Sequence, residues 1–134
     1  MKTRMVSLEK VEKDDTIVDV GDQVLKIMQY HFEKAKTIVM NGPTSWYEKG
    51  FTKQTVLITE MVRQSSAYSF LGGGDIVGLL EQRDMLKGLM FVSTGGGSLL
   101  EYLASGTLPV LRAFEKKIQD RQMLGEMIQE TNHI

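Results

Sequence analysis

Four short runs of apolar or β-favouring residues divide the chain, and none of them alternates strictly between apolar and polar positions. The runs are Thr16 to Val20, Lys36 to Met40, Ala67 to Leu71, and Leu89 to Val92. Nearly continuous apolar runs of this length are typical of strands that are buried on both faces of a sheet. Each run is therefore predicted to form a strand.

The segments between these runs carry apolar residues at helical spacing. They span residues 22–34, 52–63 and 76–86. Strands that alternate with helices of this length indicate βαβ units and a parallel sheet. We therefore expect an α/β fold, a three-layer αβα Rossmann-like unit with a short parallel sheet of about four strands. Residues 1–134 are expected to form a single domain.

Composition excludes several classes of function. Sixteen basic and seventeen acidic residues give a net charge of -1, so no electrostatic basis exists for binding nucleic acid. The absence of cysteine excludes disulfides and thiol catalysis. No apolar stretch approaches the roughly 20 residues that cross a bilayer. These features predict a cytoplasmic protein without nucleic-acid or membrane partners.

The predicted strands end in turns that are rich in glycine. Gly72, Gly73 and Gly74 follow the third strand, and Gly95, Gly96 and Gly97 follow the fourth. Ligands of open α/β sheets bind beyond the carboxyl ends of the strands, and free amides at helix N-termini bind anionic oxygens. One such turn could be only a tight connection, but two at one sheet edge predict phosphate binding. Neither turn has the spacing of the Walker loop or the GxGxxG fingerprint.

Polar residues beside these turns have two interpretations each. Asp75 could cap the following helix or bind magnesium, and its spacing favours the cap, as it does for Asp22. Ser98 with Glu101 fits a capping box. The aromatic pair Trp46 and Tyr47 could line a purine pocket or pack against the fold.

Three motifs in order give the chain a family resemblance. The segments KTIVMNGP, FLGGGD and STGGGSLLEYLASGTLPVL resemble those of phosphoglycerate kinases, as does the IVDVG run before them. The resemblance covers about residues 11–114 and corresponds to the last quarter to third of a typical family member. It implies the closing part of the nucleotide-binding domain of a two-domain, hinge-bending enzyme. That enzyme transfers a phosphoryl group between ATP and 3-phosphoglycerate in glycolysis, with Mg²⁺ and ATP or ADP bound.

The resemblance also implies roles for single residues. Asn41 and Pro43 would border the nucleotide, and Glu48 would bind the ribose hydroxyls. Asp75 would position magnesium and the phosphates beside the first glycine cluster, and Gly95–Gly97 would offer amides to the transferring phosphoryl group. Such positioning and charge stabilisation need no protein nucleophile.

The chain departs from the family pattern at several positions. Ile76 replaces a threonine, and Ser45 and Trp46 stand in a loop that usually reads MGVFE. The acid-substrate domain and the first part of the nucleotide domain have no counterpart in the sequence. We therefore expect an incomplete enzyme, with a complementing chain or self-association as its partner. The alternatives are a nucleotide-binding module without catalysis and a structural remnant that binds nothing.

Overall fold

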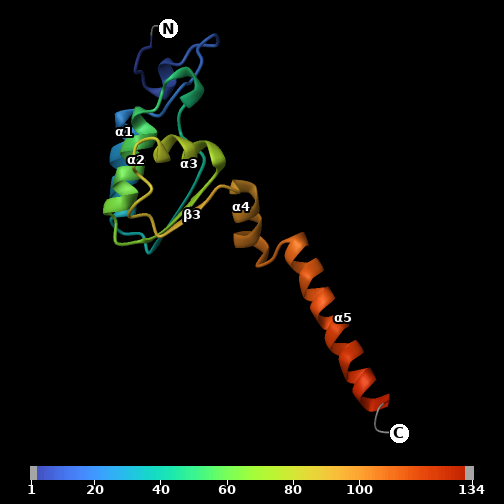
Figure 1. Cartoon of the computed structure of the whole chain (residues 1–134). Helices are drawn as coiled ribbons and strands as arrows, with labels where there is room; N and C mark the ends of the chain where they lie inside the picture. The colour runs from blue at the N-terminus through green and yellow to red at the C-terminus, as the bar shows by residue number, and fades with distance from the viewer. Residues whose placement is uncertain (1–2, 132–134) are drawn as a thin grey trace. The chain divides into compact units, whose positions relative to one another are not determined.

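The computed structural model describes residues 3–131, with side chains up to residue 123 (Figure 1). The chain divides into two compact units, unit 1 (Met1–Gly96) and unit 2 (Gly97–Ile134). Unit 1 contains the sheet and the helices α1, α2 and α3. Unit 2 contains α5 and nearly all of α4.

A parallel sheet of three strands forms the centre of unit 1. Its strands are β1 (Thr37–Asn41), β2 (Tyr68–Gly72) and β3 (Phe91–Ser93), in the spatial order β1-β2-β3. The register places Val39 opposite Phe70 and Phe70 opposite Phe91. The predicted α/β fold with a short parallel sheet is confirmed, with three strands in place of four.

Three helices pack on one face of this sheet (Figure 1): α1 (Asp22–Phe32), α2 (Lys53–Gln64) and α3 (Gly74–Glu81). Ile38 of β1 packs against Val62 of α2, and Phe32 packs against the same cluster. Leu71 of β2 packs against Ile76 and other residues of α3. The crossovers β1-α2-β2 and β2-α3-β3 wind in the same sense, as expected for right-handed connections, so both helices lie on the same face. This apolar layer fixes the strand ends from which the candidate site is built.

The prediction of a strand over residues 16–20 is wrong. This segment is irregular, and the side chain of Ile17 is exposed. Its carbonyl at Val18 accepts a hydrogen bond from the Trp46 amide at 2.8 Å, while Asp19 Oδ1 accepts bonds from Val20 N–H and the Thr44 hydroxyl. Residues 16–20 therefore hold the loop after β1 in place through hydrogen bonds. An apolar run forms a strand only where a neighbouring strand can complete its hydrogen bonds.

Helix α3 ends five residues earlier than predicted, at Glu81. Asp84 adopts a left-handed conformation with φ of 54°, and the amide of Met85 donates to the carbonyl of Leu80 at 3.0 Å. A left-handed residue followed by this bond is a common way to terminate a helix. The apolar residues Met85 and Leu86 still pack against the core around Leu71, which explains why the helical spacing continued through them.

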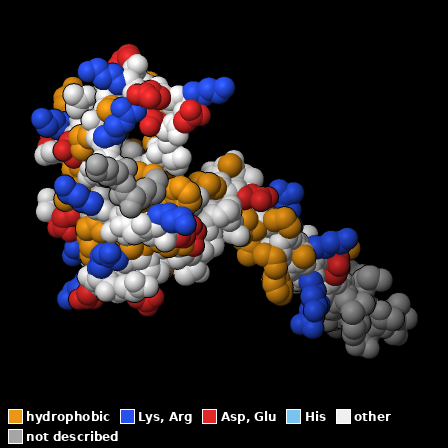
Figure 2. Space-filling view, turned by 90° about the horizontal axis from the view of Figure 1, so that it is seen from above, with side chains coloured by type: hydrophobic (Ala, Val, Ile, Leu, Met, Phe, Trp, Pro, Cys, Tyr) orange, Lys and Arg blue, Asp and Glu red, His pale blue; other side chains and the backbone are white. Residues whose placement is uncertain are grey.

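Unit 2 consists of two helices, α4 (Gly96–Ser105) and α5 (Pro109–Thr131). Because α4 begins at Gly96, Ser98 lies inside its first turn, and the predicted capping box is wrong. Large apolar side chains of α5 are exposed, among them Val110, Leu111, Phe114 and Ile118. Figure 2 shows apolar and charged side chains side by side on this helix. Within residues 3–131, no helix is both long and apolar enough to cross a membrane.

Candidate functional site

The carboxyl ends of the three strands are joined by backbone hydrogen bonds. The Gly42 amide donates to the Gly72 carbonyl at 2.9 Å, and the Gly73 amide donates to the Ser93 carbonyl at 2.9 Å. These bonds continue the parallel ladder one residue beyond each pair of strands. The turns after β1, β2 and β3 therefore meet beyond the carboxyl ends of the strands, as the sequence predicted.

Two glycines are required where these turns meet. A β-carbon on Gly96 would lie 2.5 Å from Asn41 Oδ1 and 2.9 Å from the Cα atom of Gly73, which is too close for either atom to remain in place. Gly73 itself has φ of 113°, a conformation that side chains with a β-carbon rarely adopt. Close packing of the strand ends thus accounts for Gly73 and Gly96 by itself.

The other members of the second glycine cluster have different surroundings. The Gly95 amide donates to the Ser93 hydroxyl at 3.2 Å. A β-carbon on Gly97, the first residue of unit 2, would meet no atom within 4 Å. Packing therefore does not explain Gly97, and a role of this cluster at a phosphoryl group stays a prediction.

Neither aspartate that was predicted to cap a helix does so. The N-cap residue of α3 is Gly73 and that of α1 is Gly21, and neither helix has a side-chain cap. Asp22 Oδ1 instead accepts a hydrogen bond from Gln54 Nε2 at 2.9 Å. Asp75 lies exposed in the first turn of α3, where the positive end of the helix dipole favours a negative charge.

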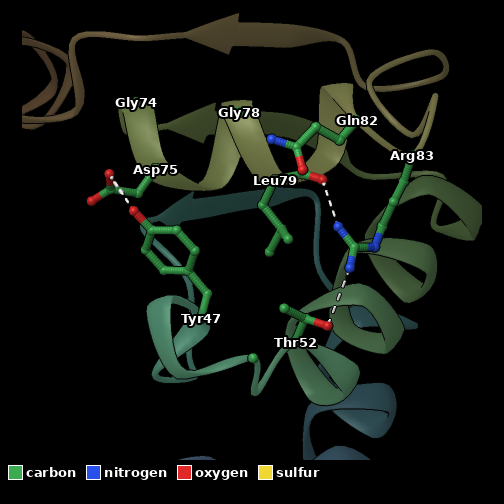
Figure 3. A pocket seen from close by; sticks show the side chains of 9 residues that line it. Tyr47, Thr52, Gly74, Asp75, Gly78, Leu79, Gln82 and Arg83 are labelled. Carbon is green, nitrogen blue, oxygen red and sulfur yellow. Dashed lines mark hydrogen bonds between the residues drawn. The ribbon is translucent and has the colours of Figure 1, made fainter.

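The carboxylate of Asp75 is held by a tyrosine from the loop after β1. Tyr47 begins the short 3-10 helix η2 (Tyr47–Lys49), and its hydroxyl donates to Asp75 Oδ1 at 2.8 Å. The hydrogen bond to this carboxylate raises the pKa of Tyr47 above its usual value, so the phenol remains a donor. Both side chains border a pocket of about 510 Å³ between the loop and α3 (Figure 3).

A cation lies at the other end of this pocket. The guanidinium of Arg83 donates to the Leu79 carbonyl at 3.1 Å and to the Thr52 hydroxyl at 3.3 Å (Figure 3). It thereby links the end of α3 to the residue before α2. Gly50 and Gly78 also line the pocket, which carries opposite charges at its two ends.

Substitutions in the loop after β1 are accommodated by one buried threonine. The Thr55 hydroxyl on α2 accepts the Thr44 amide at 3.1 Å and lies 2.7 Å from the Ser45 hydroxyl. Ser45 therefore makes a contact that a glycine could not make. The side chain of Ile76 is fully buried in the core, so it adds no polar group to the site.

The structure brings some of the predicted residues together and leaves others apart. Asn41 and the first glycine cluster meet at the strand ends, and Asp75 and Gly74 also border the pocket. Pro43 is half-buried in the turn after β1, while Glu48 and Trp46 are exposed and do not line the pocket. Of the two aromatic candidates, Tyr47 is the one that lines a pocket.

Three polar residues that line the pocket were not predicted from the sequence: Thr52, Gln82 and Arg83. The sequence offered a hint of Arg83 only, because it lies just after the end of α3, where the helix dipole favours a basic side chain. Thr52 and Arg83 are 31 residues apart, so their contact depends on how α2 and α3 pack.

The carboxylate of Asp75 is a ligand of the kind that hard cations such as Mg²⁺ prefer. Within the described part of the chain, no three acidic, histidine or cysteine side chains are grouped to hold a metal ion. Mg²⁺ commonly uses one or two carboxylates and completes its shell with water and substrate phosphates. A single exposed carboxylate at a helix N-terminus fits that arrangement.

Comparison with known proteins agrees with this geometry. The family model described as phosphoglycerate kinase matches residues 1–106. Phosphoglycerate kinase of Buchnera aphidicola subsp. Schizaphis graminum is 32% identical over 107 residues, which are 79% of this chain and 28% of that protein.

Solved structures of phosphoglycerate kinases resemble the chain as well. The enzyme from Coxiella burnetii has a TM-score of 0.74 and 30% identity, over 89% of this chain and 30% of that one. The enzyme from Pyrococcus horikoshii has a TM-score of 0.66 and 35% identity, over 75% of this chain and 25% of that one. The chain therefore spans less than a third of the length of these relatives. By sequence and by fold, the chain belongs to the phosphoglycerate kinase family.

Proposed function

We propose that this chain is the Mg-ATP and Mg-ADP binding part of a phosphoglycerate kinase-like protein. In that protein a phosphoryl group passes between ATP and 3-phosphoglycerate, as in glycolysis. The chain supplies the strand ends, the glycine turns and Asp75, and the rest of the fold supplies the acid substrate's site.

The observation that carries this proposal is the position of Asp75. Its carboxylate lies at the start of α3, directly after the glycine turn that leaves β2 and beside the pocket. Amides at the N-terminus of a helix attract phosphate oxygens, while a carboxylate there repels them unless a cation lies between. An acid at this point is therefore most useful when magnesium joins it to the phosphates.

Magnesium would be held by Asp75 Oδ2, the oxygen that does not accept from Tyr47. The ion would neutralise charge on the phosphates. The chain's own contribution is to fix this carboxylate and to present the amides of the glycine turn. In phosphoryl transfer, positioning and charge stabilisation supply almost all of the catalysis.

The chain by itself is expected to bind nucleotide without turnover. Arg83, the basic residue that lines the pocket, lies at the end away from Asp75 and already donates to Leu79 and Thr52. A transferring phosphoryl group needs cationic partners beside magnesium, and loss of one such group typically costs about 10³-fold or more in rate. The remaining part of the fold must supply those groups.

Calorimetric titration tests the proposal. Mg-ADP is titrated into the wild-type chain, into Asp75→Ala, and into Glu81→Ala, which removes an acid at the other end of the same helix. We expect saturable binding that weakens at least tenfold in Asp75→Ala and remains unchanged in Glu81→Ala. Binding that is equal in all three proteins would refute the role of Asp75. Absence of binding by the folded wild-type chain would refute nucleotide binding by this part alone.

A further inference from the structure

The pocket between the loop after β1 and α3 contains two charged side chains without a partner of opposite charge. Asp75 lines one end of the pocket and Arg83 lines the other (Figure 3). Among the described side chains, the ion pairs lie within residues 4–15 and within α2. Asp75 and Arg83 belong to none of these pairs, so a ligand can reach both charges.

Hydrogen bonds hold both charged groups in place. Asp75 Oδ1 accepts the Tyr47 hydroxyl, while Asp75 Oδ2 accepts no hydrogen bond from the described residues. Arg83 donates through Nη1 to the Leu79 carbonyl and through Nη2 to the Thr52 hydroxyl. A guanidinium carries five N–H donors, so several of them remain for a ligand. Because both groups are already ordered, a ligand loses little binding free energy in fixing them.

The space between the two charges is lined by an apolar side chain. Leu79 points into the pocket between Tyr47 and Thr52 (Figure 3). Gly50 and Gly78 line the pocket without side chains of their own, which leaves room for a ligand. A chain of methylene groups packs favourably on such an apolar side chain. The pocket therefore offers an acid, an apolar middle and a base in that order.

The geometry of α3 sets the distance between the two charges. Arg83 donates to the carbonyl of Leu79, which lies four residues, or about 6 Å of helix rise, beyond Asp75. With the lengths of the side chains added, the two charged groups lie on the order of 10 Å apart. Charge-assisted hydrogen bonds occupy about 2.8 Å at each end. A ligand that bonds to both groups therefore has its own two charges about 4–5 Å apart.

We propose that this pocket binds a small zwitterion, an ω-amino acid with about three methylene groups between its ammonium and its carboxylate. The ammonium donates to Asp75 Oδ2, the carboxylate accepts from the remaining N–H groups of Arg83, and the methylene groups pack on Leu79. One acid and one base match a ligand of zero net charge. A phosphate group would instead bring about two negative charges to a single arginine.

Such a ligand would regulate the site that is proposed for magnesium. Its ammonium occupies Asp75 Oδ2, the oxygen that the proposed function assigns to Mg²⁺. The amino acid is therefore expected to compete with Mg-ADP and not with ADP that is free of metal. The binding of the amino acid itself involves neither magnesium nor nucleotide, so the proposal does not rest on the proposed function.

A titration of the whole chain, followed by the NMR shifts of its ¹⁵N-labelled amides, tests the proposal without magnesium or nucleotide. The probe is 4-aminobutanoate. Glycine and 8-aminooctanoate serve as zwitterions of other lengths, and butanoate and butylamine serve as ligands with a single charge. We expect saturable shifts in residues 74–83 with 4-aminobutanoate, and affinities about tenfold lower or weaker for the other four compounds.

Substitutions give a second readout, with circular dichroism of each variant as the check on folding. Arg83→Gln and Asp75→Asn should each weaken binding of 4-aminobutanoate about tenfold or more. Arg112→Gln is the matched control, because it removes an exposed arginine of α5 outside this pocket, and should bind as the wild type does. Equal affinity for zwitterions of all lengths, equal affinity in all four proteins, or no saturable shift in the wild type would overturn the proposal. The comparison of lengths uses the wild type alone, so it holds even where a variant fails to fold.

These outcomes are distinct from those of nucleotide binding. A chain that binds 4-aminobutanoate but no Mg-ADP would refute the proposed function and leave this proposal standing. A chain that binds Mg-ADP but no zwitterion would do the reverse.

Discussion

The Tyr47 hydroxyl lies 2.8 Å from Asp75 Oδ1, and this bond joins the loop after β1 to the start of α3. Hydrogen bonds to a ligating carboxylate orient it toward its metal. If Asp75 binds magnesium as proposed, Tyr47 would position its carboxylate.

Tyr47→Phe should weaken binding of Mg-ADP by about tenfold, because the carboxylate loses the partner that fixes its direction. ADP without magnesium should bind Tyr47→Phe and the wild type equally. Calorimetry with and without the metal ion measures both. Tyr30→Phe is the matched control, since the Tyr30 hydroxyl on α1 accepts a hydrogen bond from Lys34, which follows that helix, and does not line the pocket. A magnesium dependence that is the same in all three proteins would contradict this role.

The titration of Tyr47 should depend on Asp75. The carboxylate raises the pKa of the phenol by accepting its hydrogen bond, so Asp75→Asn should lower the pKa of Tyr47. NMR of tyrosine labelled at Cζ can follow each of the four tyrosines through the titration. An unchanged pKa of Tyr47 in Asp75→Asn would show that the bond does not persist in solution.

The same bond predicts how stability changes with pH. The folded-state pKa of Tyr47 is raised above the unfolded value of about 10, so the bond stabilises the fold fully below that pH. Its contribution is lost as the pH rises through the folded-state pKa. Urea unfolding at a series of alkaline pH values should therefore show a steeper loss of stability in the wild type than in Tyr47→Phe. Parallel curves would contradict this linkage.

Gly96→Ala should destabilise the fold by about 1–3 kcal/mol, because the new β-carbon overpacks the contact between Asn41 and Gly73. Gly78→Ala is the matched control. It lies within α3 with no atom within 4 Å of the added carbon, and should stabilise the helix by about 0.5–1 kcal/mol. Urea denaturation measures both values. A Gly96→Ala protein as stable as the wild type would mean that the strand ends are not packed as described.

Thr55→Val should cost about 1–3 kcal/mol, because the Thr44 amide and the Ser45 hydroxyl lose their buried partner. Thr59→Val removes only a bond to a carbonyl of the same helix and should cost less. Thermal unfolding distinguishes the two. Equal losses would show that the loop after β1 does not depend on Thr55.

Local patterns of sequence predicted most of the fold and part of the site. Three of the four apolar runs form strands, and the glycine turns meet at one edge as expected. The run at residues 16–20 was wrongly predicted to be a strand. A strand needs a neighbouring strand to complete its hydrogen bonds, and the local sequence does not show whether one is present. The bond between Tyr47 and Asp75 spans 28 residues and depends on how the loop folds over α3.

The most direct test of the central claim is turnover by a single-chain chimera. In it, this chain replaces the matching segment of the Coxiella burnetii kinase, and formation of ATP from ADP is measured with the acyl phosphate of 3-phosphoglycerate as donor. We expect turnover in the chimera, none by the isolated chain, and at least a hundredfold loss in Asp75→Ala. A folded chimera that binds 3-phosphoglycerate but forms no ATP would contradict it.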